Sequence, residues 1–98
     1  MAQFDVHEVR PGQYLIDCQS DLLSNLESRF TVPLIAMDNR RNAIDRFHPL
    51  FTIEGTVMMM ITELAGAIPA RLIGRRVATL AAQEYEIKAA LDMLISGI

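Results

Sequence analysis

Apolar and polar residues alternate with a period of two over the first part of the chain, and this pattern predicts β-strands. In residues 3–6, Phe4 and Val6 share one face. A turn is predicted over residues 10–13, because its Pro and Gly favour the dihedral angles of a tight turn. Residues 14–18 form the next predicted strand. These segments are typical of a sheet with one buried face.

A third strand is predicted over residues 29–35, where Phe30, Val32 and Leu34 fall on one side. Pro33 has no N–H group to donate to a neighbouring strand. We therefore expect this strand to lie at a sheet edge or to carry a bulge.

Residues 50–53 and 56–61 predict a β-hairpin around the turn Glu54-Gly55. In this hairpin we expect Val57, Met59 and Ile61 to point inward, and at least one of Met58 and Met60 to point outward. Residues 38–48 are polar and predict a loop, with a helical turn at Ala43-Ile44. Pro69 argues against a long helix in residues 63–73, and Gly74 predicts a turn before a short strand near Val77.

The helical pattern is strongest over residues 80–95. Its apolar face is formed by Leu80, Ile87, Leu91 and Leu94. The opposite face carries little charge and consists of Tyr85, Ala89, Asp92, Met93 and Ser96. Asp92 is unfavourable near a helix C-terminus, where the helix dipole prefers a cation, so this end of the helix is a candidate for function.

Composition limits the class of protein. The 98 residues suffice for one domain, which we take as residues 1–98, and 51% hydrophobic residues indicate a globular chain. The net charge of -3 and the lack of a basic stripe disfavour direct binding to nucleic acid. The single Cys18 suits a reducing compartment, and no signal peptide or membrane-spanning run is recognised, so a cytoplasmic location is expected.

The sequence offers little for catalysis. His7 and His48 do not stand in a metal-binding motif, and we expect Cys18 to be buried and inert. No phosphate-binding loop or nucleophile motif is recognised, and no cofactor or metal is expected. The chain is therefore expected to act by binding a partner and not as an enzyme.

Three segments together resemble a known family. They are the segment DCQSDLL at residues 17–23, the segment with Arg29 and Val32-Pro33-Leu34, and the terminal Gly97-Ile98. In this order and spacing the chain resembles the CcdB family of bacterial toxins from end to end. The resemblance implies a mainly β fold, an SH3-like barrel of strongly bent antiparallel strands with one C-terminal α-helix.

The resemblance also implies a function. CcdB-like toxins are homodimers that bind the A subunit of DNA gyrase and trap the enzyme on cleaved DNA. A CcdA-like antitoxin neutralises them, and the two together repress their operon, with the DNA contacts made by the antitoxin. By position, the gyrase contact would involve Ser96, Gly97 and Ile98, with Asp92 and Ile95 beside them; supporting contacts would come from Leu22, Leu23, Gln3 and Phe4.

The chain departs from the family pattern at one of these positions. Well-known members end in Trp-Gly-Ile, whereas this chain ends in Ser96-Gly97-Ile98. Since Trp is a common binding hot spot, a weaker poison, a toxin adapted to another gyrase, and a CcdB-like binding domain that does not poison gyrase are all open. A further alternative is an endoribonuclease toxin of MazF type, which has a similar barrel but would need basic residues and an acid–base pair.

Overall fold

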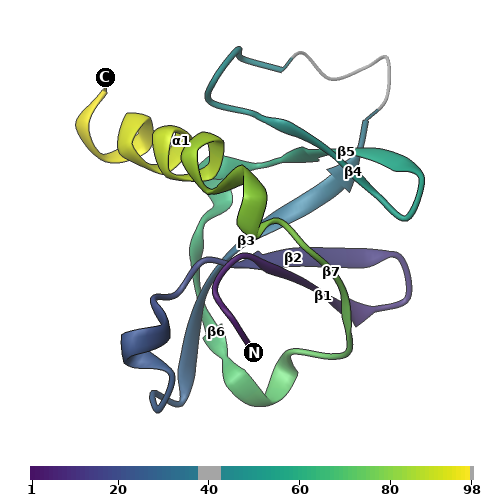
Figure 1. Cartoon of the computed structure of the whole chain (residues 1–98), viewed down its shortest axis with the longest axis vertical. Helices are drawn as coiled ribbons and strands as arrows, with labels where there is room; N and C mark the ends of the chain where they lie inside the picture. The colour runs from purple at the N-terminus through teal and green to yellow at the C-terminus, as the bar shows by residue number, and fades with distance from the viewer. Residues whose placement is uncertain (38–42, 98) are drawn as a thin grey trace.

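The computed structural model describes residues 1–37 and 43–97, and its architecture is mainly β, as predicted. An antiparallel sheet curls into a half-barrel, and a single α-helix lies across its concave side (Figure 1). The order of strands in the sheet is β4-β5-β3-β2-β1-β7, and β6 also pairs with β3. The elements are β1 (Asp5–Arg10), β2 (Gln13–Asp17), β3 (Ser28–Ala36), β4 (Leu50–Ile53), β5 (Thr56–Met60), β6 (Gly66–Pro69), β7 (Arg76–Thr79) and α1 (Glu84–Ser96).

Strand β3 is central in the sheet, so of the two alternatives predicted from Pro33 the edge position is wrong; the irregularity that was the other alternative takes the form of a break between two ladders at this residue. Strand β3 pairs with β2 on one side and with both β6 and β5 on the other. The ladder with β6 ends at Thr31 and the ladder with β5 begins at Leu34. Pro33 lies where the partner changes, and its carbonyl accepts a hydrogen bond of 2.9 Å from Ile61 N–H. The missing N–H therefore falls at a break in the ladder.

The hairpin of β4 and β5 is confirmed, with positive φ at Glu54 and at Gly55 (φ +82°) as a type I′ turn requires. The predicted inward face of β5 is confirmed for Met59 and Ile61, which are buried, but it is wrong for Val57, and neither Met58 nor Met60 points outward. Met58 and Met60 belong to the core, whereas Val57 is exposed near the hairpin tip. Met59 is also buried, so this part of the strand is covered on both faces. A shift of one residue exchanges the two faces of a strand, and the local pattern could not fix that choice.

The core lies between the concave face of the sheet and α1. Helix residues Ile87 and Ala90 are fully buried there, together with Leu80 just before the helix. The sheet contributes Val6, Ile16, Val32, Leu34, Phe51, Ile53, Met58 and Met60. The predicted apolar face is thus confirmed for its first part, but it ends earlier than expected, because Leu94 is exposed. None of the helices in the described part of the chain has the length and apolar character needed to cross a bilayer.

The remaining segments connect these layers. Residues 38–42 of the predicted loop lie outside the described residues. The turn predicted at Ala43-Ile44 falls slightly later, since the carbonyl of Ile44 accepts hydrogen bonds from the N–H groups of Phe47 and His48. No long helix forms around Pro69, as predicted; instead, the short 3₁₀ turns η2 (Thr62–Leu64) and η3 (Ala70–Leu72) flank β6. The strand that contains Val77 is also confirmed as β7, but the turn predicted at Gly74 is wrong, because residues 73–75 connect η3 to β7 without a turn.

Candidate functional site

The end of α1 forms the first part of the candidate site. Ile95 is 79% exposed, and Asp92 and Ser96 are exposed beside it. The helix ends at Gly97, which adopts a left-handed conformation (φ +73°) and donates a hydrogen bond of 2.8 Å from its N–H to the carbonyl of Met93. This is a glycine C-cap, in which the left-handed residue ends the helix. Ile98 lies outside the described residues.

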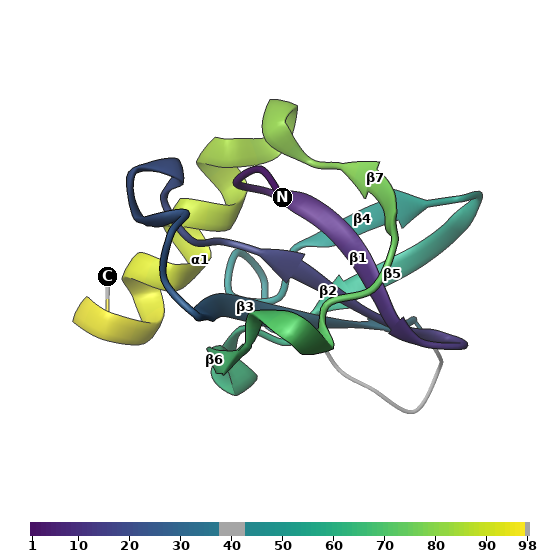
Figure 2. The same ribbon diagram turned by 90° about the horizontal axis from the view of Figure 1, so that it is seen from below.

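The second part is a short 3₁₀ turn, η1 (Asp21–Leu23), between β2 and β3. Leu22 is 94% exposed and Leu23 is about half exposed, so two adjacent leucines face solvent. The loop that carries them and the C-terminal end of α1 project from the same side of the molecule, the left side in both views (Figures 1 and 2). We use the term candidate surface for Gln3, Leu22, Leu23, Asp92, Ile95, Ser96 and Gly97.

Gln3 joins this surface through hydrogen bonds to the same loop. Its backbone N–H donates to Asp21 Oδ1 at 2.9 Å, and its side-chain Nε2 donates to the carbonyl of Cys18 at 3.1 Å. The Ser20 hydroxyl accepts from the N–H of Leu22 at 3.2 Å and caps the 3₁₀ turn. The first residues of the chain are therefore attached to the turn that presents the leucines.

Phe4 does not belong to the candidate surface, which corrects its sequence-based assignment as a contact residue. Only 4% of Phe4 is exposed, because its side chain packs in the core. Its backbone has a positive φ of +70° and is held from both sides. The N–H of Phe4 donates to the carbonyl of Asp17, and the carbonyl of Phe4 accepts from the N–H of Leu80. Phe4 thus supports the site from beneath.

A buried ion pair under the loop was not predicted from the sequence. Arg29 and Asp17 are 1% and 0% exposed, and Arg29 donates from Nε at 2.9 Å and from Nη2 at 2.6 Å to Asp17 Oδ2. The available signal was the presence of one charged residue at the end of a predicted strand and one at the start of the next. Charged residues at strand ends are also common on strands that face solvent. Their positions in the sequence therefore could not show that Asp17 and Arg29 form a buried ion pair.

Three other titratable side chains, Cys18, His7 and His48, are buried. Burial, with the nearby Asp17 carboxylate, raises the pKa of the Cys18 thiol to about 12, which agrees with an inert cysteine. His48 Nε2 lies 2.7 Å from Glu63 Oε1, and His7 Nδ1 lies 3.1 Å from the carbonyl of Gly74. Within residues 1–37 and 43–97, no three His, Cys, Asp or Glu side chains are grouped as a metal site would need.

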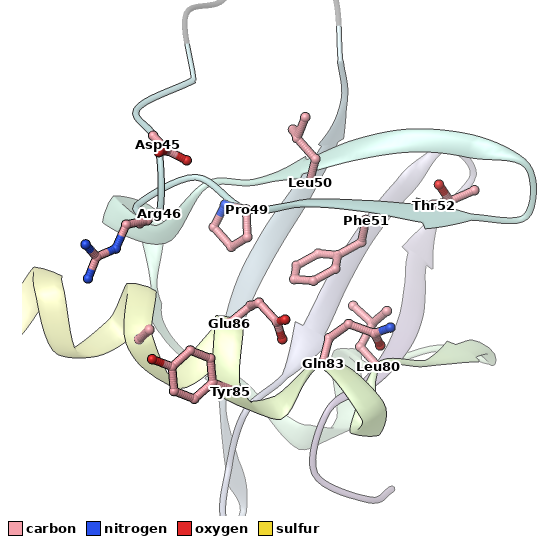
Figure 3. A pocket seen from close by; sticks show the side chains of 11 residues that line it. Asp45, Arg46, Pro49, Leu50, Phe51, Thr52, Leu80, Gln83, Tyr85 and Glu86 are labelled. Atoms are coloured by element: carbon pink, nitrogen blue, oxygen red, sulfur yellow. The ribbon is translucent and has the colours of Figure 1, made fainter.

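A groove of about 600 Å³ lies elsewhere, between β4 and the first half of α1 (Figure 3). The ring of Phe51 points into it, and Glu86 and the exposed Tyr85 line its helix side. Asp45 and Arg46 stand at one end of the groove. No residue of the candidate surface lines this groove, so it is a separate feature of the molecule.

Comparison with known proteins identifies the class first. The fold is similar to that of a "Mycobacterium tuberculosis toxin MazF-mt6", with a TM-score of 0.76 and 13% identity over 93% of this chain and 95% of that chain. It is also similar to an "Endoribonuclease in complex with its cognate antitoxin from Mycobacterial species", with a TM-score of 0.78 and 12% identity over 97% and 94% of the two chains. The architecture is thus that of a small barrel found among such toxins.

The sequence identifies the family. Residues 3–97 match the family described as CcdB protein, so the chain belongs to the CcdB family. It is accordingly a toxin of the toxin–antitoxin type. The match covers both parts of the candidate surface up to Gly97.

Proposed function

We propose that this protein inhibits DNA gyrase by binding the gyrase A subunit through the candidate surface and trapping the cleaved-DNA complex. The observation that carries this proposal is the exposure of Leu22, Leu23 and Ile95 on one side of a chain that belongs to the CcdB family. Exposed apolar side chains of this size are typical of protein-binding surfaces, and here they stand on two separate segments that project from the same side of the molecule (Figure 1). Their polar neighbours Asp92 and Ser96 can form hydrogen bonds at the rim of the interface and so orient the partner.

The small Ser96 sets the expected strength of this interaction. Ser96 is exposed and follows directly after Ile95, so an aromatic side chain in its place would extend the apolar surface. Because aromatic anchors dominate many interfaces, we expect Ser96→Trp to bind gyrase A more tightly than the natural chain. An unchanged or weaker affinity would indicate that this chain contacts its gyrase without an anchor at that position.

The test is a gyrase cleavage assay with purified protein, supported by measured affinity for the gyrase A subunit. Ile95→Ala and the double variant Leu22→Ala/Leu23→Ala are each expected to weaken binding at least about fivefold, the loss of about 1 kcal/mol or more at an interface centre. Tyr85→Ala removes an equally exposed apolar side chain in the separate groove and is the matched control. If the natural chain neither binds gyrase A nor traps cleaved DNA, the proposal is wrong.

A second candidate function is specific RNA cleavage, favoured by the fold similarity to the MazF toxin and the endoribonuclease. Fold similarity at 12–13% identity does not determine activity. The net charge of -3 also opposes strong attraction of a phosphate backbone. Incubation of the purified protein with RNA decides between gyrase inhibition and RNA cleavage. Cleavage that an Arg variant abolishes would support the ribonuclease function. Intact RNA, together with trapped gyrase, would exclude the ribonuclease function.

We further propose that the protein is a homodimer and is neutralised by a CcdA-like antitoxin, with which it represses its own operon. The structural neighbour in complex with its cognate antitoxin supports the antitoxin as a partner of this type of fold. The exposed Leu26, Leu64, Leu72 and Leu94 offer apolar area for such contacts. Light scattering after gel filtration tests the dimer, and titration with the antitoxin in the gyrase assay tests neutralisation.

A further inference from the structure

The two exposed leucines at residues 22 and 23 stand on a turn with almost no packing of its own. No residue of η1 is buried, and both leucines point to solvent. A turn with little apolar packing depends largely on hydrogen bonds for its order, and unrestrained turns open easily. The bonds that tie this turn to the sheet therefore decide how well Leu22 and Leu23 are ordered before a partner arrives.

Gln19 makes the link between the turn and the sheet. Its side-chain Nε2 donates a hydrogen bond of 2.7 Å to the carbonyl of Leu23. Its Oε1 accepts a hydrogen bond of 3.0 Å from the N–H of Phe30, in β3. One buried amide group thus joins the exposed turn to the central strand of the sheet.

The buried ion pair fixes Gln19 in turn. Asp17 uses Oδ2 for both bonds from Arg29, and its Oδ1 accepts from the N–H of Gln19 at 3.1 Å. A buried ion pair gives little net stability, because the desolvation of two charges offsets their attraction. Its value here is geometric, since the rigid pair holds the backbone at residue 19 and so aims the Gln19 amide at Leu23.

We propose that Gln19, held by the Asp17–Arg29 pair, is a positioning residue that orders the Leu22–Leu23 turn for partner binding. The proposal rests on the proposed function for the identity of the partner. The positioning itself is independent of that identity, because it concerns the order of the turn in the free protein. Pre-ordering of a binding loop improves affinity by reducing the entropy lost on association.

The main test variant is Gln19→Met, which keeps the length and approximate volume of the side chain and removes both of its hydrogen bonds. Gln19→Asn is the second variant, because its shorter side chain cannot bond Phe30 and Leu23 together. We expect gyrase A affinity to fall about three- to tenfold in both variants, because only the bond to Leu23 acts directly on the turn and one net hydrogen bond has about this size. Amide hydrogen exchange at Leu22 and Leu23 should accelerate by a similar factor, while the urea midpoint changes little.

A double-mutant cycle separates positioning from a general loss of structure. In the Leu22→Ala/Leu23→Ala background, Gln19→Met should cause no further loss of affinity, because the side chains that it positions are gone. In the Ile95→Ala background, on the separate helix, it should cause its full loss. Equal losses in both backgrounds, or unchanged exchange at Leu22 and Leu23, would overturn the proposal. If the natural chain does not bind gyrase A, accelerated exchange still supports positioning while the proposed function alone fails.

Discussion

Ile87 and Ile95 offer a direct comparison of burial and exposure on one helix. Both are isoleucines in α1, but Ile87 is fully buried in the core and Ile95 is exposed. Replacement of either by Ala changes the intrinsic helix propensity by the same few tenths of a kcal/mol. The difference between the two variants therefore measures what burial contributes.

The expected cost of Ile87→Ala follows from the atoms removed. The substitution deletes three carbon groups, worth about 2.4 kcal/mol at roughly 0.8 kcal/mol each. The cavity left under the helix adds a further cost, so we expect a total within about 2–5 kcal/mol. For a domain of this size the total stability is about 5–15 kcal/mol, and a loss of this size lowers the Tm by roughly 10 °C or more. Ile95→Ala is expected to change stability by less than about 0.5 kcal/mol.

The assay is urea denaturation followed by far-ultraviolet circular dichroism, repeated at two protein concentrations tenfold apart. The second concentration matters because Ile95 would contribute to stability in a concentration-dependent way if a second copy covered it. A loss below about 1 kcal/mol for Ile87→Ala would contradict the packing of α1 against the sheet. Equal losses for both variants at both concentrations would contradict the assignment of the two faces of the helix.

Three further predictions concern single residues. Gly74→Ala places a Cβ atom against the backbone oxygen of Glu8 and should cost about 1–3 kcal/mol, whereas Gly66→Ala meets open space and should change stability little. Comparable urea midpoints for the two variants would contradict this contact. Because burial raises the pKa of the Cys18 thiol to about 12, the folded protein should resist iodoacetamide at pH 8 and react only when unfolded. Its stability should fall as the pH rises above 9, the ordinary pKa of a cysteine thiol, because the unfolded chain then loses this proton first. Lys88→Ala removes an exposed i,i+4 ion pair and should cost only about 0.3–0.5 kcal/mol in the urea assay.

Elements encoded by neighbouring residues could be predicted from the sequence. The hairpin follows from Glu54-Gly55, and the helix from the spacing of Leu80, Ile87 and Leu91, so both are confirmed with small shifts of their ends. The glycine cap at Gly97 is likewise a local feature, since it requires only a residue that adopts the left-handed conformation. Each of these features depends on contacts within a few residues, for which local pattern is sufficient information.

Features that depend on distant pairing could not be predicted in the same way. The central place of β3 results from its three strand partners, which Pro33 by itself did not indicate. The buried pair of Asp17 and Arg29, and the position of Phe4 in the core, arise from a sheet that curls over these side chains. The family resemblance supplied the candidate residues, but only the fold could show which of them are exposed.

The chemistry of the candidate surface favours a protein partner over a nucleic acid. A MazF toxin and an endoribonuclease have a similar fold at 12–13% identity, so the discrimination between functions must come from side chains outside the core. A surface that binds a phosphate backbone needs clustered positive charge, and here the described residues of the candidate surface include a carboxylate, Asp92, and no cation. Its exposed leucines and Ile95 instead suit the apolar centre of a protein interface. Removal of these side chains should therefore affect gyrase binding without altering the fold that the two types of toxin share.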